Sequence, residues 1–196
     1  MSAQDQRYPL KADLNGIAIE IEVMKAADEQ EVLTFARTLP PHDLLFLRRD
    51  ITHPKVMQAW VRQIEDGSIH SLLARREGQL LGCSAVARDE MSWSPHVGDL
   101  RVLVAPGGRA QGLGRLLIQE SFRVALGLGL EKITAQMTVD QKGAIAAFEG
   151  LGFKPEALLR DHVRDGAGQK HDIATFSHDV TQFHAQMEAY GLTDAF

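Results

Sequence analysis

The sequence predicts an α/β protein with one mixed sheet of about seven strands and helices on both faces. Three observations lead to this fold class. Residues 17–23 alternate apolar and acidic side chains, which is the period of a half-buried strand. Residues 54–65 repeat apolar side chains at helical spacing. Residues 98–126 run from a strand through a glycine-rich turn into a largely apolar helix, so that helix is expected to pack on a sheet.

Length and composition indicate a single globular domain. The chain has 196 residues, 44% of them hydrophobic and 24% charged, which is ordinary for a folded protein. Its net charge of −5 lacks the basic surplus typical of nucleic-acid-binding domains. Its only cysteine excludes an internal disulfide and a cysteine-rich zinc site. No apolar run reaches the ~20 residues of a membrane helix, so we expect a cytoplasmic protein without nucleic-acid, membrane or metal partners.

The first half of the chain is expected to begin with a polar, flexible tail over residues 1–16. The alternating strand 17–23 follows it, and residues 28–39 are predicted as a helix that ends at Pro40 and Pro41. A second helix is predicted to start after His53, because proline suits the first helical position.

The second half alternates strands and helices. Residues 70–89 predict a hairpin with a tight turn at Glu77 and Gly78, and residues 98–104 predict the next strand. A helix over 112–126, a strand over 132–139 and a short helix ending before Gly152 follow. Two further strand-like runs complete a domain over 17–179. Residues 180–196 are expected to form a C-terminal helix, packed on the domain or at a homodimer interface.

The glycine-rich turn before the helix at 112–126 predicts an anion site. Unpaired N–H groups at a helix N-terminus carry a partial positive charge, and glycines let an anion approach them closely. A nucleoside-triphosphate loop would need Gly-Lys followed by Ser or Thr, which does not occur. A dinucleotide fingerprint would need a third small residue where Leu117 stands. The remaining alternative to an anion site is an ordinary glycine turn.

Two motifs identify the phosphate. Arg109-x-x-Gly112-x-Gly114 has the spacing of the acetyl-CoA pyrophosphate loop, and this segment resembles the GNAT superfamily of N-acetyltransferases. The segment AIAAFEGLGF, residues 144–153, is similar to that family's second motif. The order of elements from Ile17 to Ser177 also matches the family, whose sheet is mostly antiparallel.

The resemblance implies acetyl-CoA as co-substrate. The strand at 100–104 should splay from the strand at 132–139, with the pantetheine arm in the gap. The turn should hold the pyrophosphate, and an N–H near Leu103 should stabilise the oxyanion. The implied cofactor contacts are Val102, Leu103, Val104, Arg109, Ala110, Gln111, Gly112, Leu113, Gly114, Arg115, Gln141 and Phe148.

The sequence departs from the family at two positions of the second motif. Phe148 stands where the family often has a tyrosine that protonates the departing thiolate, and phenylalanine has no proton to give. Gln141 stands in place of an asparagine. A thiolate is a good leaving group, so the loss of an acid is compatible with activity.

A general base is required because an alkyl amine is mostly protonated at neutral pH. Asp99 on the motif strand is the first candidate, with Glu90 and His96 as alternatives. Two of them have a structural alternative: Asp99 can be a carboxylate paired with Arg101, and His96 can be an exposed loop residue.

The sequence therefore predicts an acetyl-CoA-dependent N-acetyltransferase that transfers the acetyl group directly to a primary amine in a ternary complex. The acceptor is either a small molecule or a peptide. The alternative is a CoA-sensing or protein-interaction module that kept the fold and little catalysis, which Phe148 favours.

Overall fold

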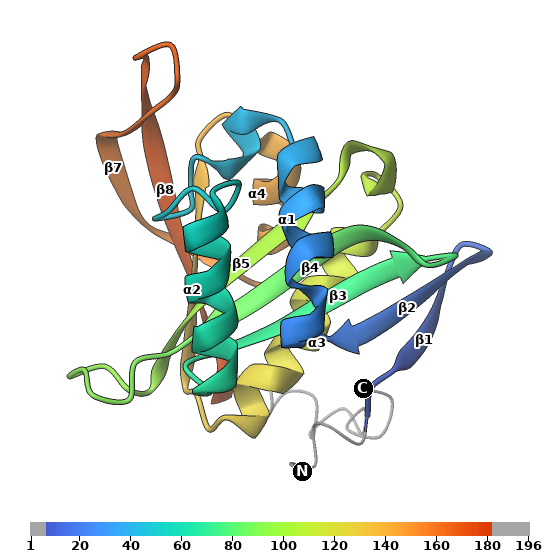
Figure 1. Ribbon diagram of the computed structural model, residues 1–196. Coiled ribbons are helices and arrows are strands. Elements are labelled where there is room, and N and C mark those ends of the chain that lie inside the picture. Colours follow the sequence, from blue (N-terminus) through green and yellow to red (C-terminus); the bar gives the residue numbers. More distant parts are fainter. Residues whose placement is uncertain (1–6, 182–196) are drawn as a thin grey trace.

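The structure, a computed structural model, describes residues 7–181. Within this range eight strands form one sheet in the order β1-β2-β3-β4-β5-β6-β8-β7 (Figure 1). The strands are β1 Leu10–Leu14, β2 Ile17–Val23, β3 Ile69–Arg76, β4 Gln79–Ala87, β5 Val97–Val104, β6 Lys132–Thr138, β7 Lys154–Arg164 and β8 Lys170–Asp179. The α-helices are α1 Glu29–Thr38, α2 Pro54–Glu65, α3 Leu113–Gly127 and α4 Lys142–Glu149. Three short 3-10 helices are η1 Ala26–Asp28, η2 Pro41–Leu44 and η3 Pro106–Gly108.

The sheet has one strand more than the sequence analysis expected. Leu10–Leu14, which we had assigned to a flexible tail, pair antiparallel with β2. The hairpin turn is Asn15-Gly16, and both residues have positive φ (57° and 84°). Asn-Gly is the strongest two-residue hairpin signal, because a type I′ turn requires positive φ at both positions. The prediction of a flexible tail over residues 10–14 is therefore wrong, and Asn15-Gly16 is the local sequence signal for this hairpin.

Helices cover both faces of the sheet, as predicted, and each face has its own apolar core. Against one face, α1 and α2 bury side chains that include Phe35, Met57 and Trp60. Against the other, α3 and α4 bury side chains that include Leu117 and Phe148. Figure 1 shows α1 and α2 in front of the strands and α3 behind them.

The adjacent strands β5 and β6 are the only parallel neighbours among the described residues. Their register runs from Val97↔Lys132 to Leu100↔Ala135 and then stops, although β5 continues to Val104 and β6 to Thr138. Each strand keeps its other neighbour over the remaining length, β4 for β5 and β8 for β6. The sheet therefore opens between β5 and β6 at one end, where the sequence analysis expected a splay.

The C-terminal helix expected over 180–196 lies almost entirely outside the described residues. Val180 is buried, and its N–H donates to the carbonyl of Glu131 at 2.8 Å.

His178 on β8 is expected to make stability depend on pH. Its ring packs edge-on against Phe122 (centroids 4.8 Å apart) and lies 5.4 Å from Phe153, and burial lowers the pKa of the imidazole. The neutral form therefore contributes stability that is fully present above the unfolded pKa of about 6.5 and is lost as pH falls through the lower folded pKa. We expect the melting temperature to fall more steeply below pH 6.5 in the wild type than in His178→Phe. The exposed His162→Phe should keep the wild-type slope, and identical slopes in all three proteins would contradict this role.

Candidate active site

The turn after β5 presents backbone N–H groups at the start of α3. Ala110 and Gly112 both have positive φ (58° and 85°), and Gly112 is the N-cap of α3. The first helical hydrogen bond from the N-cap carbonyl runs from the Leu116 N–H to Gly112 (3.0 Å). The N–H groups of residues 113–115 therefore precede the helical ladder and are free to bind an anion.

Two residues of β5 direct their backbone groups into the gap beside β6. In an antiparallel ladder, hydrogen-bonded pairs alternate with unbonded ones. Ala105 donates to the Leu81 carbonyl (2.8 Å), and two positions earlier Leu103 faces Cys83. By this alternation the Leu103 N–H points to β4, whereas Val102 and Val104 face the gap. The oxyanion donor expected near Leu103 is thus better matched by one of its two neighbours.

A cavity of about 750 Å³ fills the gap between the turn, the splayed strands and α4. It is lined by every cofactor contact that the sequence analysis named except Gln111. These are Val102, Leu103, Val104, Arg109, Ala110, Gly112, Leu113, Gly114, Arg115, Gln141 and Phe148. Gln111 instead donates its side-chain amide to the Gly107 carbonyl (3.2 Å), so its side chain holds the turn.

The two residues that depart from the family motif have structural roles. Gln141 is the N-cap of α4, and its Oε1 accepts from the Thr138 N–H at 3.1 Å. Phe148 is buried, and its ring packs edge-on against Phe153 with centroids 4.8 Å apart. Phe148 therefore contributes an apolar wall to the cavity and no proton.

The segment between α1 and α2 supplies cavity residues that the sequence analysis missed. Asp43 on η2 pairs with Arg109, whose guanidinium also donates to the Val104 carbonyl (3.1 Å). His42 contacts Asp140 (2.8 Å), and hydrogen bonds from Thr138 and then His42 lower the pKa of that carboxyl group. Only tertiary structure brings η2 to this cavity, so no local pattern in residues 41–44 could have shown it.

A second cavity, of about 460 Å³, lies on the α2 side of the sheet. Asp99 and Arg101 line it, and Arg101 donates to the Asp99 carboxylate from Nε (3.0 Å) and Nη2 (2.7 Å). Both side chains are about one quarter exposed. Leu103, two residues further along the same face of β5, lines both cavities. Leu103 therefore belongs to the walls of both cavities, at a junction on β5 three residues past the last β5–β6 pair.

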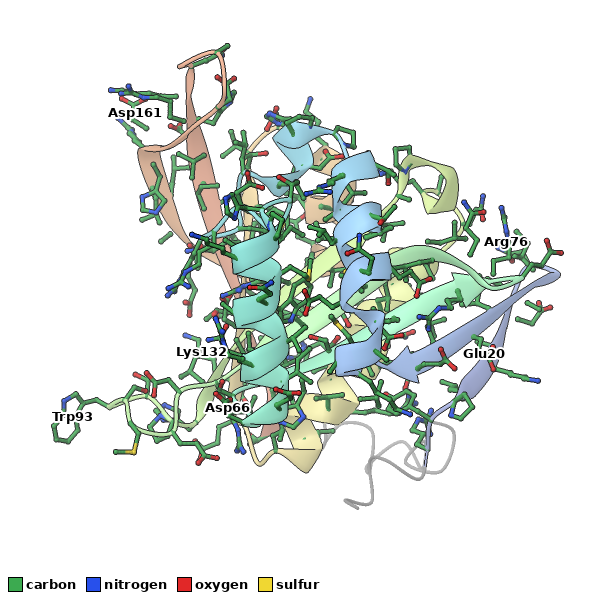
Figure 2. All side chains as sticks on the ribbon, viewed as in Figure 1. Glu20, Asp66, Arg76, Trp93, Lys132 and Asp161 are labelled. Atoms are coloured by element: carbon green, nitrogen blue, oxygen red, sulfur yellow. The ribbon has the colours of Figure 1, made fainter. Side chains whose placement is uncertain are left out.

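The other two candidate bases lie away from this junction. Glu90 is exposed and pairs with Arg88 at 2.6 Å, and the exposed His96 uses its carbonyl to accept from Glu131 and Lys132. Neither residue lines either cavity. Trp93, in the same loop, is fully exposed and points away from the molecule (Figure 2).

Cys83, the metal-ligating side chains and the helices within residues 7–181 bear on other chemistries. Cys83 is fully buried, and burial raises the pKa of its thiol to about 12, so it is a poor nucleophile. Within residues 7–181 no three His, Cys, Asp or Glu side chains cluster closely enough to hold a metal ion. No helix in the same range combines the length and the apolar character that crossing a membrane requires.

Comparison with known proteins agrees with this geometry. The family described as Acetyltransferase (GNAT) matches residues 33–153, and no curated protein matches the sequence significantly. A GNAT-family acetyltransferase from Streptococcus pneumoniae has 20% identity and a TM-score of 0.71, over 82% of this chain and 99% of that one. The protein yncA from Salmonella typhimurium, solved with acetyl-CoA, has 16% identity and a TM-score of 0.71 over 83% and 94%.

A third similar structure is spermidine N-acetyltransferase from Vibrio cholerae in complex with CoA and spermine. It has 15% identity and a TM-score of 0.69, over 83% of this chain and 96% of that one. At these identities the structures show a shared fold. The family match extends over more than half of the chain, from α1 through α4. On this evidence the protein belongs to the GNAT family of acetyltransferases.

Proposed function

We propose that the protein transfers the acetyl group of acetyl-CoA to the nitrogen of a primary amine. The observation that carries this proposal is that Leu103 lines both cavities. The larger cavity has the N–H-rich turn of a phosphate site, and the smaller one reaches the same strand from the opposite face. A thioester at the junction would be open to an amine from the smaller cavity. Relatives solved with acetyl-CoA, or with CoA and spermine, support this pair of ligands.

The reaction needs positioning more than activation. The amine nitrogen forms a bond to the acetyl carbon, the carbon–sulfur bond breaks, the thiolate leaves, and the nitrogen loses a proton. An N–H from Val102 or Val104 would stabilise the charge that develops on the acetyl oxygen, because it faces the gap between the strands. The free N–H groups of residues 113–115 would hold the pyrophosphate. Arg115 and Lys142, which line the same cavity, would add positive charge near the phosphates.

Asp99 is the residue we propose as the base, either directly or through water, because of the three candidates it alone lines the smaller cavity. Asp99→Asn is expected to lower kcat by about 10²–10⁴-fold, the usual range for general acid–base catalysis, and to flatten the rise of rate with pH. Asparagine keeps an acceptor oxygen for Arg101, so the fold should be retained.

The pH profile of kcat/KM is the decisive measurement for Asp99. Glu90→Gln and His96→Asn serve as matched controls, since both side chains lie outside the cavities. An unaltered profile in Asp99→Asn would show that the base is another group, and a flattened profile in either control would identify that group.

The second candidate function is a CoA-binding module with little catalysis. Phe148 favours it, because this residue cannot protonate the departing thiolate. Both functions predict CoA binding. Release of free thiol from acetyl-CoA in the presence of an amine panel separates them, since only the enzyme gives amine-dependent turnover.

Thermal unfolding with acetyl-CoA, CoA and ATP tests the cofactor. At a ligand concentration of about 100 times Kd, binding stabilises the fold by ~2.7 kcal/mol. For a chain of this length that raises the melting temperature by roughly 5–10 °C. A shift with both CoA ligands and none with ATP supports the proposal. No shift with either CoA ligand would mean that the glycine turn is only a turn.

A further inference from the structure

The charge of the smaller cavity selects among amine acceptors. Four arginines and two aspartates line it: Arg48, Arg49, Arg88, Arg101, Asp89 and Asp99. The chain as a whole carries a net charge of −5, so this excess of guanidinium groups is opposite in sign to the rest of the protein. A cationic acceptor would enter such a cavity against its potential, whereas an anionic group would be attracted.

The two carboxylates of the cavity differ in their partners. Asp99 accepts two hydrogen bonds from Arg101. Asp89 accepts the Met91 N–H at 3.0 Å, which fixes the start of the β4–β5 loop. The charge of Asp99 is therefore balanced by Arg101, whereas Asp89 keeps its charge, and four arginines against two aspartates leave the lining positive.

The arginines, in contrast, keep unused donors. Arg88 pairs with Glu90 through Nη2, but its Nε is buried and has no hydrogen-bond partner among residues 7–181. Arg48 and Arg49 are exposed at the rim, and no carboxylate of the described chain forms an ion pair with either. The Arg88 Nε has no exposed surface, so a ligand in the open cavity would contact other atoms of Arg88. Guanidinium groups match carboxylate and phosphate oxygens in geometry.

We infer that the acceptor amine carries an anionic oxyacid group, a carboxylate or a phosphate, which is held by the arginines of the smaller cavity. Arg88 and the rim pair Arg48 and Arg49 are the residues assigned to that group. The anion binds at the α2 side, and the amine of the same molecule points to Leu103 and the junction. This inference rests on the proposed function, since it names the class of acceptor for that reaction.

The test compares anionic amines with neutral and cationic ones, at saturating acetyl-CoA. For a carboxylate, the α-amides of four amino acids are compared with the acids glycine, leucine, phenylalanine and glutamate. For a phosphate, phosphoethanolamine is compared with ethanolamine. Spermidine represents the polycations. We expect the favoured anionic amine to exceed its neutral partner by about tenfold or more in kcat/KM, the factor of one charge-assisted hydrogen bond. The amine of an α-amide is less basic than that of the acid, so a larger fraction of it is unprotonated and able to attack. Protonation of the amine therefore cannot explain a preference for the acid.

Variants assign the preference to the arginines. Two variants remove these groups: Arg88→Gln, and the double variant Arg48→Gln/Arg49→Gln. Both should raise KM for the anionic acceptor with little change in kcat. Both should keep the rise in melting temperature that acetyl-CoA causes. Arg62→Gln, an exposed residue of α2 outside both cavities, is the matched control. A structural defect would instead lower the melting temperature without ligand.

The outcomes separate this inference from the proposed function. Preference for an amino acid identifies a carboxylate, and preference for phosphoethanolamine identifies a phosphate. Preference for spermidine or for the neutral amines overturns the inference, as does a preference that survives all arginine variants. If no amine is acetylated, the affinities of the same acceptors are measured by calorimetric titration into CoA-saturated protein. Equal affinities for acids and amides would then overturn the inference. Loss of acetyl-CoA binding itself would contradict the proposed function instead.

Discussion

Gly114→Val is expected to abolish acetyl-CoA binding while the protein remains folded. Gly114 lies in the first turn of α3 and lines the larger cavity, where the free N–H groups point. A Cβ at this position would lie 3.7 Å from Val104, an ordinary contact, so the fold accepts it. The branched side chain would keep phosphate oxygens from the backbone. Loss of two charged hydrogen bonds, each about 1.5–3 kcal/mol, weakens binding by at least about 100-fold.

The measurement is the dissociation constant for acetyl-CoA, together with the melting temperature of the ligand-free protein. Gly107→Val is the matched control, because it lies in the same turn region, a Cβ there meets nothing within 4 Å, and it does not line the cavity. Gly112 is the poorer choice, since its φ of 85° would strain any side chain. Unchanged affinity in Gly114→Val would refute the phosphate site.

The parts of the fold that local patterns determine were predictable from the sequence. The alternation of 17–23 and the helical spacing of 54–65 gave elements within a residue or two of β2 and α2. The glycine spacing after residue 109 predicted a turn that lines the larger cavity. The hairpin at Asn15-Gly16 was equally predictable, because Asn-Gly permits the positive φ that both residues of this turn adopt.

What the sequence could not show depends on which segments meet in three dimensions. Residues 41–44 carry no motif, yet His42 and Asp43 line the larger cavity. The arginines of the smaller cavity come from three separate segments, residues 48–49, 88 and 101, so no single stretch of the sequence contains them. The direction of each N–H along β5 depends on its register with β4, and a pattern of period two leaves that register open.

Glu120→Ala is expected to destabilise the fold strongly without touching either cavity. Glu120 lies on α3 with a side chain only 2% exposed, and it pairs with Arg7 and Arg123. The Tyr8 hydroxyl also donates to it at 3.1 Å, and burial followed by this carboxylate raises the pKa of Tyr8. Alanine would leave two arginines and a hydroxyl without their common acceptor.

Breaking a buried ion pair from one side costs about 3–5 kcal/mol. The lower end applies here, because Arg7 retains 35% exposure and Arg123 20%, so both can regain some water. About 3 kcal/mol lowers the melting temperature by roughly 6–12 °C in a chain of this length. Alanine is the better helix former, so the loss cannot come from helix propensity.

A matched set of variants separates the ion-pair network from the volume of the side chain. Glu120→Gln keeps the shape and one acceptor oxygen, so it should lie between wild type and alanine. Glu65→Ala, an exposed carboxylate at the end of α2, should stay within about 0.5 kcal/mol of wild type. Urea unfolding should show a lower midpoint at unchanged slope. Because Glu120 lines neither cavity, the dissociation constant for acetyl-CoA should be preserved below the melting transition. If Glu120→Ala melts together with the Glu65→Ala control, the buried carboxylate does not stabilise the packing of Arg7 and Tyr8 on α3.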